Sequence, residues 1–349
     1  MGENCNKVGW WCQYSESRLV DIENKLLTIV KTAYRTWFVP IGSTIGNDDK
    51  IWTIALNEEG TKTPLVMLHG FAAGIGLWCM NFDEIAKDRP VYAIDLLGFG
   101  RSSRPNFAND CETAEQQWIS TIEAWRKQLK MDKFILLGHS FGGYLATSYA
   151  INYPNRVKHL ILADPWGFSE RMLRRPSLLV RAIGFVLYPL TYLNPLATVR
   201  AVGPFGPWFI RKIRSDLSRK YEDAFDEKDI ITEYIYHCNA QYPSGEAAFH
   251  SFMKGFGWAK NPMVRRLDKL YDDIPITVIY GEYSWIDKGP GKLLQEKKKY
   301  VNVEIIPDAG HQVYSDQPKL FNQVIPRRRI SKTKMSFSRN WTTHKTVAP

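Results

Sequence analysis

The sequence predicts an α/β fold, in which a mostly parallel central sheet is flanked by helices and interrupted by an inserted cap. Short apolar runs alternate with helix-like stretches, which is typical of parallel strands buried on both faces. This alternation stops after residue 168 and resumes near residue 263. At 349 residues and 44% hydrophobic side chains, the chain is long enough for one large domain with an insertion.

Seven runs are predicted to be strands. The first alternates between apolar and polar residues, and most of the later ones are continuously apolar. They are residues 51–56, 65–68, 91–94, 134–137, 160–163, 276–280 and 303–306. Before the fourth run, Thr113 and Gln116 match a capping box, and Trp118, Ile122 and Trp125 form the apolar stripe of a helix.

The fourth strand is followed by Gly138-His139-Ser140-Phe141-Gly142-Gly143 and then by a helix-like stretch. A strand, a Gly-x-Ser-x-Gly turn and a helix together place a serine hydroxyl on a sharp, exposed turn at the end of a sheet. Ser140 is therefore the candidate nucleophile. A serine in a glycine-rich turn without chemical function is the alternative.

Two backbone N–H groups are candidates for holding the oxyanion that forms during acyl transfer. The second predicted strand is followed by His69-Gly70-Phe71, the position of one such donor in hydrolases with this turn. We assign the donors to Phe71 and to Phe141, which follows the nucleophile. An ordinary strand-to-helix turn is the alternative.

The base and the acid are expected on loops after later strands. His311 follows the last predicted strand, and Asp287 follows the strand before it. The order Ser140, Asp287, His311 is the one that this fold uses. Asp164, which ends the fifth predicted strand, is the rival acid.

The N-terminal residues 1–48 are predicted to be an amphipathic, tryptophan-containing segment that contacts lipid. Apolar residues recur with helical spacing between residues 19 and 33, and Trp10, Trp11 and Trp37 flank them. Indole rings favour the boundary between lipid and water. The alternative is that this helix packs against the body of the protein.

Charge and cysteine content limit the classes of partner and the cellular compartment that we expect for this protein. The net charge is +10, but seven of the 46 Lys and Arg residues follow Pro326, and the remaining 39 nearly balance 36 acidic residues. We therefore expect no nucleic-acid partner. Five scattered cysteines without metal spacing, and no recognisable secretory signal, favour a reduced, cytoplasmic compartment. No metal or organic cofactor is expected.

The chain resembles the α/β-hydrolase-domain proteins 4 and 5 from about residue 50 to residue 325. The stretches that carry the resemblance include Leu96–Pro105, Asp164–Phe168, Thr232–Asn239 and His311–Pro318. The resemblance implies an α/β-hydrolase fold and either of two activities. Type 4 proteins deacylate N-acyl phosphatidylethanolamines, whereas vertebrate type 5 proteins have asparagine in place of the nucleophile and coactivate a triacylglycerol lipase on lipid droplets.

Within this resemblance, Ser140 places the chain with the hydrolytic branch. The coactivator branch carries an arginine in the loop after the strand before the acid, and the absence of a basic residue from Glu282 to Asp287 weakens the coactivator reading. The implied substrate is a phospholipid or lysophospholipid, met at a lipid droplet or membrane surface. The family is also credited with acylation of lysophosphatidic acid through a His-x4-Asp motif, which His311 and Asp316 match. Asp316 could instead cap the helix that begins near Pro318.

The expected organisation has five parts. Residues 49–168 and 263–325 form the hydrolase core, residues 169–262 form the cap, residues 1–48 form the lipid-contact segment, and residues 326–349 form a basic, disordered tail. Pro326 ends the final helix, and the tail lacks apolar periodicity. The tail departs from the family pattern, in which the final helix continues. Whether the loop that holds His311 is fully supported without that helix is therefore an open question.

Overall fold

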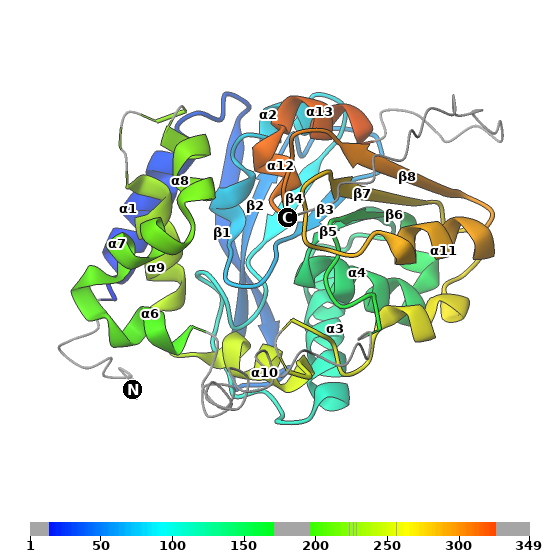
Figure 1. The fold of residues 1–349 in the computed structure, drawn as a ribbon, viewed down its shortest axis with the longest axis horizontal. Coiled ribbons are helices and arrows are strands. Elements are labelled where there is room, and N and C mark those ends of the chain that lie inside the picture. The colour runs from blue at the N-terminus through cyan, green and yellow to red at the C-terminus, as the bar shows by residue number, and fades with distance from the viewer. Residues whose placement is uncertain are drawn as a thin grey trace, which may run out of the picture.

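The computed structural model describes residues 14–170 and 196–325, apart from residues 223, 226, 228 and 256. The described part contains an eight-stranded sheet with the order β1-β2-β4-β3-β5-β6-β7-β8 (Figure 1). The strands are β1 (Tyr34–Gly42), β2 (Asp49–Leu56), β3 (Leu65–Leu68), β4 (Val91–Ile94), β5 (Phe134–His139), β6 (Val157–Ala163), β7 (Ile276–Gly281) and β8 (Val301–Ile306). From β4 to β8 all neighbouring strands are parallel, so the predicted fold class is confirmed.

The seven predicted strands are all present, but the sequence analysis missed β1. This strand pairs antiparallel with β2, which in turn pairs antiparallel with β4. β1 is an edge strand, and only Val39 and Ile41 along it are buried. Its sequence therefore lacks the continuous apolar run that marked most of the central strands.

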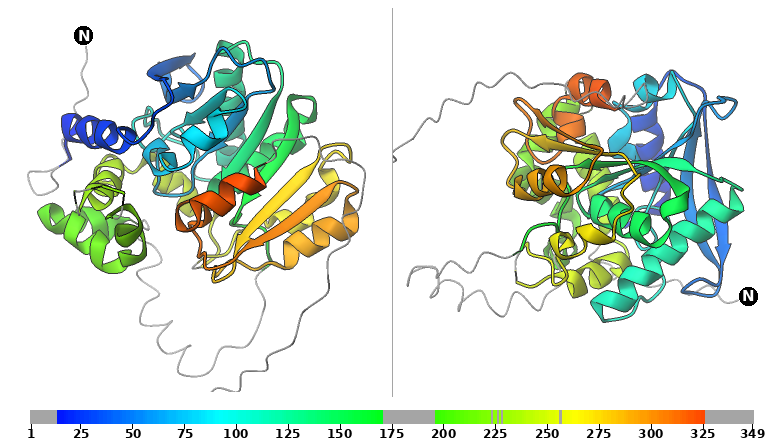
Figure 2. Two further views of the ribbon diagram at one scale, coloured as in Figure 1. Left: turned by 90° about the horizontal axis from the view of Figure 1, so that it is seen from above. Right: turned by 90° about the vertical axis from the view of Figure 1, so that its right-hand side faces the viewer.

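Helices cover both faces of the sheet (Figure 2). Side chains of α3, α4 and α10 belong to one buried cluster, and those of α1, α2, α9, α12 and α13 belong to the other. The α-helices are α1 (Glu16–Leu27), α2 (Phe82–Ala86), α3 (Cys111–Gln128), α4 (Phe141–Asn152), α6 (Ala197–Ala201), α7 (Gly206–Ile213), α8 (Ser215–Glu222), α9 (Ile230–Asn239), α10 (Ser244–Phe252), α11 (Gly289–Lys297), α12 (Val313–Asp316) and α13 (Pro318–Val324). The 3₁₀ helices are η1 (Ile75–Trp78), η2 (Pro154–Arg156), η4 (Gly203–Phe205), η5 (Met263–Arg265) and η6 (Leu267–Lys269).

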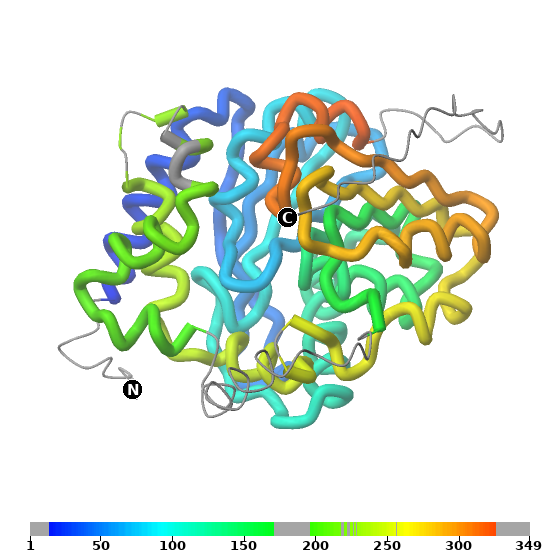
Figure 3. Tube along the Cα trace, in the orientation of Figure 1, coloured from blue at the N-terminus to red at the C-terminus, as the bar shows by residue number. Residues whose placement is uncertain are grey.

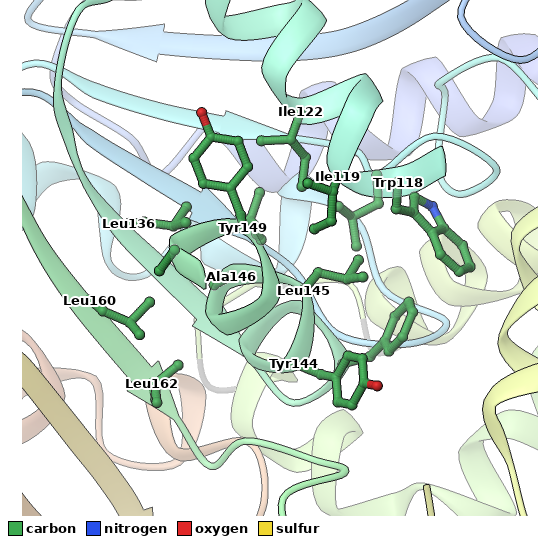
Figure 4. Close-up of a cluster of buried hydrophobic side chains, with 14 of the residues drawn as sticks. Trp118, Ile119, Ile122, Leu136, Tyr144, Leu145, Ala146, Tyr149, Leu160 and Leu162 are labelled. Atoms are coloured by element: carbon green, nitrogen blue, oxygen red, sulfur yellow. The ribbon is translucent and has the colours of Figure 1, made fainter. Parts of the chain in front are cut away.

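Helix α4, which begins directly after Ser140, is surrounded by the core. Its residues from Phe141 to Ala150 are all buried. Figure 4 shows this helix between two strands and α3, with labelled side chains Tyr144, Leu145, Ala146 and Tyr149 from α4, Trp118, Ile119 and Ile122 from α3, Leu136 from β5, and Leu160 and Leu162 from β6. Close packing on all sides holds the start of α4, and with it Ser140, in one position.

The described part of the predicted cap is helical. Helices α6 to α9 gather beside α1, although α1 lies far away in the sequence (Figures 1 and 3). Helix α10 packs against α3, and its Phe249 ring stacks on the ring of Phe71 at a centroid distance of 4.3 Å. The cap therefore reaches the loop that carries one of the predicted oxyanion donors.

The N-terminal helix packs against the body, so its predicted contact with lipid is wrong. The apolar stripe of α1, represented by Leu19, Ile22 and Leu26, is at most 1% exposed, and it faces α9 and the core. Trp37 lies within β1, partly buried against the core, with the Arg35 guanidinium 3.8 Å from its ring centroid. The boundary at residue 48 is also wrong, because α1 and β1 belong to the core. Trp10 and Trp11 lie outside the described residues.

Two helix ends were predicted with different success. The N-cap of helix α3 lies three residues before Thr113 of the proposed capping box: Asp110 is the N-cap and accepts a hydrogen bond from the Thr113 N–H at 2.8 Å. Helix α13 ends at Val324, before Pro326, as expected. Within the described residues, no helix is both long and apolar enough to cross a bilayer.

Candidate active site

Ser140 lies on a strained turn between β5 and α4. Its φ of 52° and ψ of −117° are rarely adopted by a residue with a side chain. The turn depends on close backbone approach, because a Cβ atom at Gly138 would lie 2.2 Å from the Gly142 carbonyl oxygen, and one at Gly142 would lie 2.4 Å from the Leu68 carbonyl oxygen. These glycines explain why the predicted motif requires small residues on both sides of the serine.

His311 bridges Ser140 and Asp164. Its Nε2 atom lies 2.9 Å from the Ser140 hydroxyl oxygen, and its Nδ1 atom lies 2.5 Å from Asp164 Oδ2. Asp164 is fully buried, whereas Ser140 is 7% exposed. This is the geometry of a nucleophile, a base and an orienting carboxylate.

The prediction that Asp287 is the acid is wrong in this geometry. Asp287 is exposed, and its carboxylate accepts hydrogen bonds from the Ser169 hydroxyl (2.8 Å) and the Gly289 N–H (2.9 Å). Asp164 is in place because β6 neighbours β5 with Ala163 opposite His139, so the residues that follow the two strands lie side by side. The strand that precedes Asp287 is one position further away in the sheet.

The loop after β7 nevertheless contributes to the acid. The Ser284 hydroxyl donates a hydrogen bond to Asp164 Oδ2, and the Gly281 N–H lies 3.3 Å from Oδ1. Together with His311, these groups give the buried carboxylate three partners, as a buried charge requires. Sequence reasoning did not identify Ser284, and no sequence signal marks it.

The backbone around His311 is held by three hydrogen bonds. Asp316 Oδ2 accepts from the Gly310 N–H at 2.6 Å, and the Ala309 carbonyl accepts from the Tyr283 N–H at 2.8 Å. The His311 carbonyl lies 2.9 Å from His139 Nε2. Burial holds the pKa of His139 well below its usual range, so His139 is neutral and donates from Nε2. The loop is thus tied to three different elements.

Asp316 does not cap the helix that follows it, so that expectation is wrong. The N-cap of α13 is Gln317, which makes no side-chain capping bond. The Asp316 carboxylate instead contacts Gly310 and forms an ion pair with Lys220 of α8. Both of its oxygen atoms are therefore occupied.

The two predicted oxyanion donors border the nucleophile. A Cβ atom at Gly70 would lie 3.1 Å from Ser140 Cβ, so the loop that carries Phe71 passes beside the serine. Phe141 is the first residue of α4, where backbone N–H groups lack partners within the helix. Neither the Phe71 N–H nor the Phe141 N–H donates a hydrogen bond within the described part of the chain. Their role as donors stays a prediction.

Trp285 lines the rim of the site beside the base. Its ring centroid lies 5.1 Å from that of His311, and the side chain is 63% exposed.

As for metal binding, no three His, Cys, Asp or Glu side chains in the described ranges are grouped as ligands.

Two buried carboxyl groups lie behind the loop after β3. Asp95 accepts hydrogen bonds from the N–H groups of Ile75 (2.8 Å) and Arg101 (2.7 Å), and Glu23 accepts from the Arg101 guanidinium (2.9 Å) and the Trp52 indole (2.8 Å). Burial and the nearby charge of Glu23 raise the pKa of Asp95 to about 7, and burial raises the pKa of Glu23. The pair therefore retains a proton near neutral pH.

This carboxyl pair should make the free energy of unfolding fall as pH rises from about 4 to about 7. A carboxyl whose pKa is higher in the folded than in the unfolded protein binds its proton more tightly when folded, and this stabilisation is lost as pH passes the folded pKa. Glu23→Gln removes one charge and keeps an acceptor for Arg101 and Trp52. Urea unfolding from pH 5 to pH 8 should show a weaker pH dependence for this variant.

Buried histidines change the free energy of unfolding in the opposite direction, so the pH profile of Glu23→Gln must be compared with that of the wild type. Burial lowers the pKa of His69, His159 and His237 to about 4, which raises stability as pH rises from about 4 to about 6.5. This contribution is the same in both proteins and cancels in the difference. Identical pH profiles would contradict the coupling between Glu23 and Asp95.

Residues 63–318 match a family model described as alpha/beta hydrolase fold. The 1-acylglycerol-3-phosphate O-acyltransferase ABHD5 of Mus musculus is 48% identical over 319 residues, which cover 89% of each protein. The (Lyso)-N-acylphosphatidylethanolamine lipase of Bos taurus is 47% identical over 319 residues, which cover 89% of this chain and 91% of the lipase.

A solved structure agrees with the fold. Naproxen esterase from Bacillus subtilis superposes with a TM-score of 0.62 at 18% identity, covering 89% of this chain and 97% of the esterase. At this identity the likeness concerns the fold alone. The two curated relatives are almost equally similar to this chain and carry different names, so similarity by itself does not choose between their activities.

Proposed function

The chain belongs to the α/β-hydrolase family, and on this premise we propose that it is a serine hydrolase that deacylates phospholipids or lysophospholipids, N-acyl phosphatidylethanolamines among them. The observation that carries the proposal is the hydrogen-bonded series from Ser140 through His311 to Asp164. The similarity to a (Lyso)-N-acylphosphatidylethanolamine lipase supports the substrate class.

In the proposed reaction, the Ser140 oxygen attacks the carbonyl carbon of an acyl ester while His311 Nε2 takes the hydroxyl proton. Asp164 stabilises the imidazolium that forms, and the N–H groups of Phe71 and Phe141 hold the oxyanion. The tetrahedral intermediate expels the lysolipid alkoxide, which receives the proton from His311. Water then attacks the acyl-serine by the same proton transfers and releases the fatty acid.

Acyl transfer is the second candidate. A relative 48% identical to this chain is named an acyltransferase for 1-acylglycerol 3-phosphate. In its reaction the acyl-serine would form from an acyl donor such as acyl-CoA, with release of the CoA thiol, and a lysolipid hydroxyl would then replace water as the acceptor of the acyl group. A chain without catalytic activity that coactivates a triacylglycerol lipase is the third reading, and the serine at position 140 disfavours it.

The test is mass-spectrometric turnover of a lipid panel by the purified protein. The panel contains N-acyl phosphatidylethanolamine, lysophospholipids, monoacylglycerol, and lysophosphatidate with acyl-CoA. Loss of one phospholipid class with release of fatty acid is the expected result. Phosphatidate formation without hydrolysis would favour the transferase, and no turnover by a folded sample would favour the coactivator.

The proposed lipid contact, at a lipid droplet or an intracellular membrane, is supported by the cap. Over nine residues of η4 and α7, Phe205, Trp208 and Ile213 are 61%, 60% and 56% exposed. Lys212 between them is also exposed, whereas Ile210 of α7 is buried. Exposed aromatic and aliphatic side chains beside a lysine suit the interface between lipid and water.

Replacing Phe205 and Trp208 with Ser should reduce the amount of protein that cosediments with phosphatidylcholine vesicles about 10-fold or more, because two large apolar side chains leave the lipid. Tyr271→Ser is the matched control, since Tyr271 is 55% exposed outside the cap. Thermal midpoints check that both variants are folded. Equal losses of binding in the two variants would contradict an α7 contact.

A further inference from the structure

Asp316 is a buried carboxylate close to the base but outside the hydrogen-bonded series. Its side chain is only 3% exposed, so the carboxylate has lost most of its hydration. This loss costs free energy unless other groups replace the water. Two partners compensate: the Gly310 N–H, at 2.6 Å from Oδ2, and the Lys220 ammonium, which forms an ion pair with Oδ1. Gly310 directly precedes His311, so Asp316 acts on the backbone that carries the imidazole.

Lys220 connects this carboxylate to the cap. It lies on α8 and is 27% exposed. The adjacent Tyr221 is fully buried and donates a hydrogen bond to the Leu77 carbonyl at 2.7 Å, and Leu217 on the same helix is 2% exposed. Helix α8 is thus anchored to the body on both sides of the ion pair, and it presents the ammonium to the base loop.

We infer that Asp316 is a positioning residue for His311, and that Lys220 holds Asp316 in place and so joins the cap to the base. The inference rests on the proposed function, because it presupposes that His311 is the base. The imidazole must keep one nitrogen on the serine and the other on Asp164, and displacement by about 1 Å costs roughly 100-fold in rate. A loop tied at Gly310 prevents this displacement.

The contacts of Asp316 favour positioning over direct chemistry. One oxygen accepts from a backbone amide, the other faces an ammonium, and the side chain is only 3% exposed, so the carboxylate is poorly placed to take a proton from a lysolipid hydroxyl. Removing one partner of this partly buried pair also leaves the other charge without its counter-ion, so each partner should matter for the other. The His-x4-Asp spacing then reflects support of the base.

The charges around His311 set the expected pH response. Asp164 follows β6, and the neutral His139 belongs to β5. Arg214 after α7 is paired with Asp216 of α8 at 3.0 Å, and Lys220 is paired with Asp316. Removing one member of the last pair therefore leaves a net charge near the base. A residual Asp316 anion favours the imidazolium, whereas a residual Lys220 cation disfavours it.

The experiment measures the rate of Ser140 labelling by a fluorophosphonate as a function of pH, together with kcat and KM for a short soluble ester. Asp316→Ala should lower the labelling rate and kcat about 10- to 100-fold with KM nearly unchanged. Asp316→Asn keeps an acceptor for Gly310 and should recover most of the rate. Lys25→Met, which breaks an exposed ion pair between α1 and Glu227, is the control.

The pH profiles separate positioning from a general loss of structure. Lys220→Met should move the pH of half-maximal labelling upward and Asp316→Asn should move it downward, each by roughly 0.3 to 1 unit. The double variant should lie near the wild type. Wild-type rates in both Asp316 variants, or losses without opposite pH shifts, would overturn the inference.

Amide hydrogen exchange keeps the inference separate from the proposed function. Exchange at Gly310 and His311 should be faster in Asp316→Ala than in Asp316→Asn, whether or not a substrate is known. A wild-type protein that neither reacts with the probe nor hydrolyses any ester would refute the proposed function. Unchanged exchange at these amides in Asp316→Ala would refute the positioning role.

Discussion

Ser140→Ala is expected to lower ester hydrolysis by about 10⁴-fold or more, because it removes the hydroxyl that forms the proposed acyl-enzyme. The fold should be unaffected, since His311 is the only hydrogen-bond partner of the Ser140 hydroxyl within the described ranges. Fatty-acid release measured by mass spectrometry, with fluorophosphonate labelling alongside, tests this expectation.

Ser43→Ala provides the control for this measurement. Ser43 is exposed, and its hydroxyl donates a hydrogen bond to the Asn47 carbonyl. Both residues are distant in the sequence from Ser140, Asp164 and His311. This variant should retain wild-type turnover. Hydrolysis that survives in Ser140→Ala would contradict the acyl-enzyme mechanism. Phosphatidate formation that survives in Ser140→Ala would instead place acyl transfer on residues other than Ser140.

Asp164→Asn is expected to lower kcat by about 10³- to 10⁴-fold, whereas Asp287→Asn should change it by less than about threefold. The Asp164 carboxylate orients the imidazole and stabilises its charged form, and an amide does neither. Asp287 is exposed, and its carboxylate accepts hydrogen bonds from Ser169 and Gly289 rather than from His311. Steady-state kinetics of the two variants on one soluble ester makes the comparison direct.

The same pair of variants can refute the assignment. A large loss in Asp287→Asn together with a small loss in Asp164→Asn would mean that the acid during turnover is Asp287. Thermal midpoints are needed beside the kinetics, because Asp164 also accepts from Ser284 and Gly281, and its replacement weakens the contact between the ends of β6 and β7.

The sequence by itself determined those features that depend on neighbouring residues. Most of the central strands were recognisable because continuous apolar runs of four residues suit burial on both faces of a sheet. The serine turn was recognisable because Gly138 and Gly142 approach backbone atoms so closely that a side chain would collide. His311 was recognisable as the candidate base because it follows the last predicted strand. In each case the physical requirement acts within one short stretch of chain.

Only the tertiary structure decided features that depend on which elements become neighbours. Asp164 and Asp287 both follow strands, and the order β5-β6-β7 together with the register brings Asp164 beside Ser140. The stripe of α1 is compatible with lipid or protein, and contact with α9 buries it. Such choices are made by packing between segments that are separated in the sequence, and a local pattern carries no information about the partner that will cover it.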